Sequence, residues 1–491
     1  MKRGYLSKIF HRLLIFSPFV IVFIASLYPP ADSDLGWHLK YGEYFFQHSR
    51  ILRDNTFSTM MPNYHWVNSS WATDLLSYSV FHYLGFLGMT ILGALVITLT
   101  FYFFAKAAKL SLWQEAFLFP LLLYFEQPVN VVSFRGQLLT FLFLGILFYL
   151  LSLYETGKSK KIFLVIPLFT LWVNFHGEYL LGLGVLTLWI FIYLAEKFFY
   201  SMKEQRSGIL REAKMLSGII ILSFLATLVN PFGIGVYIES SNHFFNPWQK
   251  YVAEWLPFNE LSQLWWNHII MGTLILVGFM ALFFTDKLKR NIPYLVIVLL
   301  FFALSFMMRR YAWPLYYMAL PLITPLSDLF NPPDNKIRTI AVSILLILTL
   351  FIILILRYPF EQYLTMNWEK YCSDYRSCSP KAAEFLIKNN LNRDKLITLY
   401  DWGGWIIWNY PQIRPSIDGR MHLWKDEKGY SAFAEYYPIE QNWKDIDASG
   451  FNTAFMSPSK SGYDRLIELA KEGKWKLVYQ DQFAGIFIRG K

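Results

Sequence analysis

The stretch IRTIAVSILLILTLFIILIL, residues 337–356, holds a single charged side chain, that of Arg338. A helix needs about 20 predominantly apolar residues to cross a bilayer, so this stretch predicts a transmembrane helix. Residues 13–28 have the same character, and across the whole chain 55% of residues are hydrophobic while only 16% are charged. This composition is typical of a membrane protein and argues against an ordinary soluble chain.

The apolar runs predict how often the chain crosses the membrane. We expect a polytopic all-α membrane domain with about eleven transmembrane helices. The N-terminal run resembles a signal peptide, but Leu27-Tyr28-Pro29-Pro30 offers no small-x-small cleavage site, so we expect an uncleaved first helix. The predicted spans lie near residues 13–29, 86–105, 112–126, 136–154, 162–176, 179–197, 215–230, 268–285, 292–308, 311–329 and 337–357.

Basic residues between the spans predict the orientation. With a cytoplasmic N-terminus, every lysine-rich connection falls on the cytoplasmic side, as the positive-inside rule requires. An odd number of spans then places the C-terminus outside, in a multi-pass protein of the plasma (inner) membrane. Because the net charge of +10 is spread over short clusters, the bilayer and not nucleic acid is the expected partner. The clusters are Lys106 and Lys109; Lys158, Lys160 and Lys161; Lys203, Arg206, Arg211 and Lys214; Lys287, Lys289 and Arg290; and Lys336 and Arg338.

The composition changes near residue 357, which predicts a transmembrane domain of residues 1–357 and a small extracytoplasmic α/β domain of residues 358–491. In the second domain we expect helices over 381–390 and 461–472, strands over 395–400 and 405–408, and a terminal hairpin of 475–479 and 485–489. Cys372 and Cys378 are the only cysteines. They form a disulfide in an oxidising compartment or remain two free thiols.

The first outer loop, residues 29–85, is too long for a simple connector, and loops of this length tend to be functional. It opens with Asp32-Ser33-Asp34-Leu35-Gly36-Trp37-His38-Leu39-Lys40 and closes with Trp66-Val67-Asn68-Ser69-Ser70-Trp71-Ala72-Thr73-Asp74. In an extended segment both carboxylates of Asp-x-Asp point the same way, which suits a divalent cation or one acid fixing the other as a base. The alternative is that both acids cap the helix that begins around Gly36.

Cations also gather on the outer side, at Arg135, Arg309 and Arg310. Arginines at the outer ends of apolar helices run against the positive-inside trend, and bidentate binding of an anionic lipid phosphate would explain them. For Arg135 the alternative is snorkelling toward lipid headgroups.

Three further outer residues have two interpretations each. His176 fits a role with phosphate or acceptor, and equally a polar contact at a helix end. Glu254 either acts in the site or pairs with a cation such as Lys250 or Arg310. In Asn230-Pro231-Phe232-Gly233 the first interpretation is a helix stop and turn, with Asn230 a weaker candidate for the site.

With these features the chain resembles the GT-C superfamily of integral-membrane glycosyltransferases, and most closely its uncharacterised bacterial members. The resemblance covers nearly the whole chain. One departure is Gly136, where the family pattern leads us to expect proline after the arginine. The matching segments are residues 32–39 with Gly42, 71–74, 134–137, 171–177 and 228–233, then Glu254-Trp255, Arg309-Arg310-Tyr311, 401–405 and 417–420.

The resemblance implies a sugar donor linked to polyprenyl phosphate, an acceptor reached from outside, and an essential acid in the first outer loop. Asp34, or failing that Asp32, matches this acid, and Asp74 is the candidate second carboxylate. Asp34 would act as the base in an inverting displacement, while Arg135, Arg309, Arg310 and His176 would stabilise the departing phosphate. The acceptor is an envelope glycan, a lipid or a protein.

Some superfamily members use a divalent metal, so Mg²⁺ or Mn²⁺ at Asp32 and Asp34 is an option and no cofactor is certain. A further set of residues either contacts the acceptor or serves structure; for the motifs around 402–405 and 418–420, the structural alternative is tight turns with an Asp-Arg ion pair. This set is His38, Asn174, Glu254, Trp405, Asp418 and Arg420.

Other classes of protein share some of these features. An O-antigen-type polymerase or ligase also acts outside on lipid-linked sugars, but it relies on arginine and histidine. A lipid-linked glycan transporter should show repeats and ionisable groups near mid-membrane, and the chain has no convincing inverted repeat. A non-catalytic envelope assembly protein is the third alternative. The sequence favours an enzyme at the outer interface.

Overall fold

The computed structural model describes residues 2–157, 161–200, 206–244, 246–259, 263–283, 292–392 and 395–490. The chain forms two compact units. The first, here the helical unit, comprises Met1–Tyr28, Thr90–Gly233 and Ala253–Leu364. The second, here the mixed unit, comprises Pro29–Met89, Ile234–Val252 and Thr365–Lys491, so it combines the first outer loop with the C-terminal segment.

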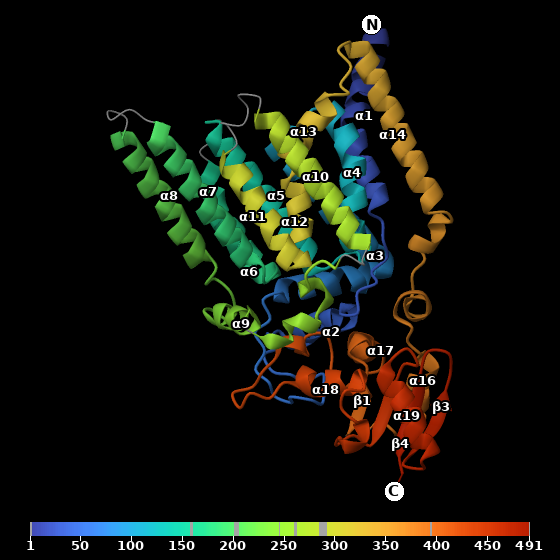
Figure 1. Cartoon of the computed structure of the whole chain (residues 1–491). Helices are drawn as coiled ribbons and strands as arrows, with labels where there is room; N and C mark the ends of the chain where they lie inside the picture. The colour runs from blue at the N-terminus through green and yellow to red at the C-terminus, as the bar shows by residue number, and fades with distance from the viewer. Residues whose placement is uncertain are drawn as a thin grey trace. The chain divides into compact units, whose positions relative to one another are not determined.

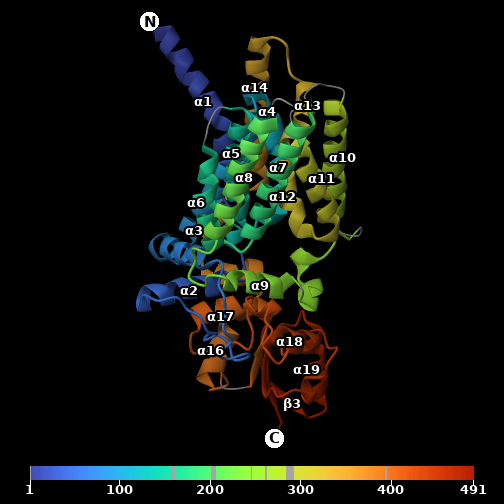
Figure 2. The ribbon, with the colours of Figure 1, turned by 90° about the vertical axis from the view of Figure 1, so that its left-hand side faces the viewer.

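Long helices build the helical unit, and Figures 1 and 2 show them side by side. Within it α10 lies against α13, α6 against α8, and α7 against α11. The helices are α1 (Lys2–Ala25), the later part of α3 (Trp71–Ala108), α4 (Leu112–Asn130), α5 (Gly136–Glu155), α6 (Val165–Phe175), α7 (Tyr179–Tyr200), α8 (Arg206–Ala226), α10 (Gln263–Phe283), α11 (Ile292–Met307), α12 (Ala312–Met318), α13 (Leu320–Asp328) and α14 (Asn335–Leu356).

Helices occur at every predicted span, and five of the described ones are long and apolar enough to cross a membrane: Trp71–Ala108, Gly136–Glu155, Tyr179–Phe199, Leu264–Phe283 and Asn335–Leu356. Shorter apolar helices cover Arg12–Ala25, Lys161–Phe175 and Ile292–Met307. In α14 the side chains of Ile347 and Leu356 are 66% and 76% exposed. Apolar exposure on this scale is expected of a helix in contact with lipid.

The predicted span 311–329 differs from expectation, because two helices, α12 and α13, replace one. Pro321 stands at the start of α13. A proline has no backbone N–H and its ring clashes with the preceding turn, so it favours a new helix start over the continuation of the old helix.

The mixed unit contains a four-stranded sheet in the order β1-β2-β4-β3. Its strands are β1 (Leu396–Thr398), β2 (Thr453–Met456), β3 (Trp475–Gln480) and β4 (Gly485–Arg489). β1 pairs parallel to β2, with Leu396 opposite Thr453, while β4 is antiparallel to both β2 and β3. The predicted α/β character, the strand near 395–400 and the terminal hairpin are confirmed.

Short helices complete the mixed unit: α2 (Leu35–His48), the early part of α3, α9 (Gly235–Phe244), α15 (Trp368–Lys370), α16 (Pro380–Lys388), α17 (Gly403–Asn409), α18 (Ala432–Glu440) and α19 (Ser461–Lys471). Ser379 caps α16 through its side chain, so the helix predicted after Ser379-Pro380 is confirmed, as is the helix predicted over 461–472. Figure 1 shows α19 beside the strands that it covers.

The strand predicted over 405–408 is wrong, because these residues belong to α17. Trp405, Ile406 and Ile407 are all buried. A short, fully buried apolar run has no readable period, so the sequence cannot separate a strand from a helix there.

Candidate active site

The Asp-x-Asp pair lies where the chain enters α2. The backbone N–H of Asp34 donates to Oδ1 of Asp32 at 3.0 Å. Asp34 occupies the N-cap position of α2, yet its side chain makes no capping hydrogen bond, so the capping interpretation is wrong for Asp34. Asp34 is half-buried, and its carboxylate does not bind the helix end.

Gly419 lies directly against this carboxylate. A Cβ atom at residue 419 would stand 1.7 Å from Oδ1 of Asp34, so any larger residue would displace this carboxylate. Burial and the charge of Asp32 raise the pKa of Asp34 to about 7, although His38 opposes the shift. A carboxyl with this pKa exchanges a proton near neutral pH, as general-base catalysis requires.

His38 and Asp74 form a buried pair behind Asp34. Nδ1 of His38 lies 2.5 Å from Oδ1 of Asp74, and Nδ2 of Asn68 donates to Oδ2 of Asp74 at 2.6 Å. Burial alone would lower the pKa of His38, but the carboxylates of Asp74, Asp34 and Asp32 raise it. Asp74 is fully buried and bound to His38, so its position suits orientation of the histidine.

Asp418 and Arg420 form the ion pair that the structural interpretation predicts. Nη2 of Arg420 lies 2.7 Å from Oδ2 of Asp418, and Nε lies 2.7 Å from Oδ1. Burial would raise the pKa of Asp418, but Arg420 outweighs it and lowers the pKa. Ser58 also donates to Asp418, and Asn55 accepts from Arg420 at 3.0 Å. Because both pair members are almost inaccessible, this pair positions Gly419 and does not meet an acceptor.

Gly36 and Gly404 allow the close approach of α2 and α17. A Cβ at Gly36 would lie 1.9 Å from the carbonyl oxygen of Gly404, and a Cβ at Gly404 would lie 2.3 Å from that of Ser33. Trp405 itself is 1% exposed, so it serves the core of the mixed unit.

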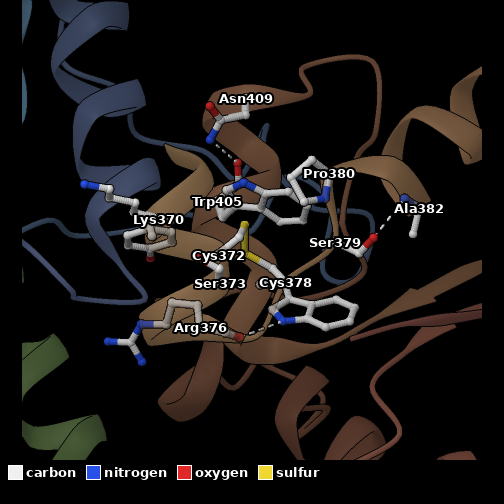
Figure 3. Close-up of a disulfide and its surroundings, with 12 residues drawn as sticks. Lys370, Cys372, Ser373, Arg376, Cys378, Ser379, Pro380, Ala382, Trp405 and Asn409 are labelled. Carbon is white, nitrogen blue, oxygen red and sulfur yellow. Dashed lines mark hydrogen bonds between the residues drawn. A yellow bond between two sulfur atoms is a disulfide. The ribbon is translucent and has the colours of Figure 1, made fainter. Parts of the chain in front are cut away.

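Cys372 and Cys378 are joined in a disulfide, which decides between the two predicted states. Figure 3 shows the bond with Trp405 beside it. Nearby, the Arg376 side chain donates to the carbonyl oxygen of Ala31, and Tyr371 donates to that of Asp32 at 2.6 Å. The disulfide segment therefore holds the backbone that leads into the Asp-x-Asp pair.

Arginines and glutamates form a network in the helical unit. Nη1 of Arg135 lies 2.7 Å from Oε1 of Glu254, and Nη1 of Arg310 lies 3.3 Å from Oε2 of the same carboxylate. Arg310 also binds Glu178 through Nε. Burial would raise the pKa of Glu178, but Arg310 and then His176 lower it, so Glu178 is ionised. The predicted Glu254–Arg310 pair is confirmed, whereas Arg135 binds Glu254 and Gln137 in place of snorkelling.

His176 and Arg309 are bound by neighbouring groups of the helical unit. Nδ1 of His176 lies 2.8 Å from Oγ1 of Thr140 and 3.4 Å from Oε2 of Glu178. A Cβ at residue 136 would stand 2.7 Å from Cδ2 of His176, which explains glycine where proline was expected. Arg309 donates through Nε to the carbonyl oxygen of Pro257 at 3.0 Å.

Asn174 and Asn230 bind backbone groups near the ends of α6 and α8. Nδ2 of Asn174 donates to the carbonyl oxygens of Thr170 and Val229 at 2.7 and 2.9 Å. Asn230 binds Thr227 and Gly233 and accepts from the Phe232 N–H at 2.8 Å, so the predicted stop and turn after α8 is confirmed.

The sequence analysis missed Asn55, Ser58, Gly419 and Glu178 as site residues. Ser58 meets Asp418 across 360 positions of sequence, and no local pattern marks such a contact. Gly419 could have been identified from the sequence, because it lies in the segment 417–420 that carries the family resemblance.

The described residues contain no group of three or more His, Cys, Asp or Glu side chains that could hold a metal ion. Asp32 and Asp34 supply two carboxylates. Mg²⁺ is commonly bound by one or two carboxylates together with substrate phosphates and water, so these two residues would hold it only with a phosphate ligand.

Comparison with known proteins supports the fold. No protein-family model matches the chain, and no curated protein matches its sequence. The Archaeoglobus fulgidus oligosaccharyltransferase in its apo form matches with a TM-score of 0.54 and 10% identity, over 91% of this chain and 70% of that chain. The same enzyme tethered to an acceptor peptide containing the NVT sequon matches with a TM-score of 0.54 and 10% identity, over 91% of this chain and 69% of that chain. The chain therefore has the fold of an oligosaccharyltransferase, which agrees with the GT-C resemblance at the level of the fold.

Proposed function

We propose that the chain is an inverting membrane glycosyltransferase that moves a sugar from a polyprenyl-phosphate donor to an extracytoplasmic acceptor. The acceptor is an envelope glycan, a lipid or a protein. The observation that carries the proposal is the setting of Asp34, a half-buried residue whose carboxylate does not cap α2, lies against Gly419 and has a pKa raised to about 7. The fold shared with an oligosaccharyltransferase supports it.

In this reaction an acceptor oxygen or nitrogen attacks the anomeric carbon and the bond from that carbon to the phosphate oxygen breaks. Asp34 takes the proton that the acceptor loses, and polyprenyl phosphate leaves with the bonding electron pair. A base works best when its pKa lies near the working pH. Asp32 contributes by raising the pKa of Asp34, and His38, held by Asp74, lowers it and so limits the shift.

The departing phosphate needs positive charge. We propose that Arg135 and Arg310 supply it, because the Glu254 carboxylate already binds both guanidinium groups as an anion would. A phosphate would compete with Glu254 for the same donors. Glu178 keeps Arg310 in place through Nε. Arg309 and His176 remain weaker candidates, since Arg309 donates to the carbonyl oxygen of Pro257 and His176 contacts Thr140 and Glu178.

A divalent metal at Asp32 and Asp34 is a further proposal. When bound, such an ion would neutralise phosphate charge as a Lewis acid. Asp32 and Asp34 would hold the ion and fix its position.

We also propose that the protein lies in the plasma (inner) membrane with a cytoplasmic N-terminus and that the mixed unit is extracytoplasmic. The Cys372–Cys378 disulfide supports this placement, because disulfides persist in oxidising compartments.

The test is transfer of labelled sugar from a panel of polyprenyl-phosphate donors by purified protein in lipid. Wild type should release polyprenyl phosphate, and Asp34→Asn should not. Asp54→Asn is the matched control, because Asp54 lies in the same loop but is exposed and pairs only loosely with His65 at 3.3 Å. Added chelator tests the metal.

If Asp34→Asn transfers sugar like wild type, the catalytic assignment fails. If no donor is consumed while a glycan of the cell still depends on the protein, a transporter or an assembly protein explains the chain better. Loss of activity in Arg310→Lys but not in Asp34→Asn would favour a polymerase or ligase that relies on arginine.

A further inference from the structure

The mixed unit contains a cavity of about 710 Å³ that the proposed reaction does not use. Three stretches line it: residues 59–64 of the first outer loop, the segment from Asp426 to Glu435, and the residues before β1 and β2, among them Lys395 and Phe451. Pockets for small ligands have volumes of this size and combine apolar walls with a few polar groups.

Hydrogen bonds hold the first lining stretch, residues 59–64, in place. The N–H of Thr59 donates to the carbonyl oxygen of Pro415 at 2.9 Å, and that of Met60 donates to Ser416 at 3.1 Å. From inside the loop, Nδ2 of Asn55 donates to the carbonyl oxygens of Met60 and Met61 at 3.0 and 3.1 Å. This stretch is therefore formed before any ligand arrives.

Three residues with positive φ line this cavity. Met61, Asn63 and Lys395 have φ angles of 49°, 64° and 68°. Residues other than glycine rarely adopt positive φ, and such strain collects at ligand-binding sites. All three residues line the cavity; Met61 and Asn63 belong to the same loop stretch, and Lys395 comes from a distant segment.

Aromatic rings and carboxylates also line the cavity. Tyr430 is 40% exposed, and its hydroxyl donates to Oε2 of Glu435 at 2.7 Å. Oδ1 of Asp426 accepts from the N–H groups of Lys428 and Tyr430. Tyr64 stacks on Trp424 with ring centroids 4.6 Å apart. The ring of Tyr430 is thus presented in a fixed orientation, with carboxylate oxygens beside it.

The chemistry of this lining favours a hydroxyl-rich, uncharged ligand. Asp426, Glu435 and Lys395 bring charges of both signs, so neither an anion nor a cation is strongly selected. Carboxylate oxygens accept from sugar hydroxyls, the ammonium and the Asn63 amide donate to them, and an aromatic ring packs on the C–H face of a pyranose. A peptide strand has no obvious place, because Ser416 binds Thr398 at the outer edge of β1.

We propose that this cavity binds saccharide, as a second site that holds part of a glycan away from the reacting sugar. The proposal rests on the proposed function only for the source of the glycan, which is the acceptor or a distal part of the donor. Binding of sugar to the cavity is independent of transfer.

Saturation-transfer NMR on the full chain in lipid nanodiscs tests this, with a panel of neutral mono- and disaccharides, a set of neutral tripeptides, and empty nanodiscs as the blank. Tyr430→Ala should weaken saccharide binding about tenfold or more, since it removes the ring. Tyr430→Phe keeps the ring and should bind nearly as wild type. Asn63→Gly keeps the positive φ, removes the amide, and should weaken binding severalfold.

Trp443→Ala is the matched control, because Trp443 is a 62% exposed aromatic of the same unit outside the cavity. Equal loss in Trp443→Ala and Tyr430→Ala would overturn the proposal, as would binding of tripeptides only, or binding of no saccharide in the panel. Asp34→Asn should still bind saccharide. If wild type binds saccharide through Tyr430 but transfers no sugar, the proposed function fails and this inference stands.

Discussion

Gly419 is the residue on which the position of the Asp34 carboxylate depends. Gly419→Ala would place a methyl group 1.7 Å from the present Oδ1 position, so the carboxylate must turn away. A displacement of about 1 Å in a catalytic group costs roughly 100-fold in rate, and we expect this loss in the transfer assay with normal folding. Gly218→Ala in α8, where a Cβ would have nothing within 4 Å, should be as active as wild type; equal activity of both variants would contradict the assignment.

Asp34 should also set the pH dependence of transfer. Its pKa is raised to about 7 by burial and by Asp32, so the carboxyl is protonated below that pH and cannot act as a base. Transfer at limiting donor should fall about tenfold per pH unit well below pH 7 and level off above it. A rate profile that is flat between pH 5 and about 8 would exclude Asp34 as the base.

The Asp418–Arg420 pair should matter for stability more than an exposed pair does. Arg420→Ala leaves a buried carboxylate without its partner, which typically costs about 3–5 kcal/mol. We therefore expect a clearly lower midpoint of denaturant unfolding. Arg465→Ala removes a surface pair with Asp445 and should change the midpoint little, because exposed pairs are screened by solvent.

At the scale of elements, the contact between α2 and α17 brings the Asp-x-Asp segment to the Asp418 turn. Gly36→Ala would put a methyl group 1.9 Å from the backbone oxygen of Gly404, and backbone cannot move aside as a side chain can. We expect a loss of about 1–3 kcal/mol in the free energy of unfolding. The comparison is Gly184→Ala in α7, which meets nothing within 4 Å; similar loss in both would show that the helix contact is not special.

The α17 segment also shows where sequence patterns fail for an element. Trp405 to Trp408 were expected to form a strand, yet they belong to the helix α17, which packs against α2 with Gly404 at the contact. The amphipathic helices α16 and α19 were predictable, since each exposes one polar face.

For the whole molecule, the proposed topology is open to a labelling test. Trp443→Cys, at an exposed position of the mixed unit, should react with a membrane-impermeant maleimide in intact cells. Lys109→Cys, in the turn between α3 and α4, should react only after permeabilisation. The native cysteines do not interfere, because they form a disulfide. Labelling in the reverse order would invert the topology and place Asp34 on the cytoplasmic side.

The sequence by itself determined the helical membrane character, the positions of the apolar helices apart from the division between α12 and α13, and the strands β1, β3 and β4, but it did not predict β2. These features are local, since the length and spacing of apolar residues must match the bilayer thickness or the strand period. The sequence also singled out Asp34, Arg135 and Arg310, but with roles left open between capping, snorkelling and binding.

Only the tertiary structure decided that the first outer loop folds with the C-terminal segment in one unit, that Gly419 encloses Asp34, and that Glu254 joins Arg135 to Arg310. Contacts such as Ser58 with Asp418 span 360 positions. They arise from the packing of whole elements, and side-chain spacing along the chain carries no record of that packing.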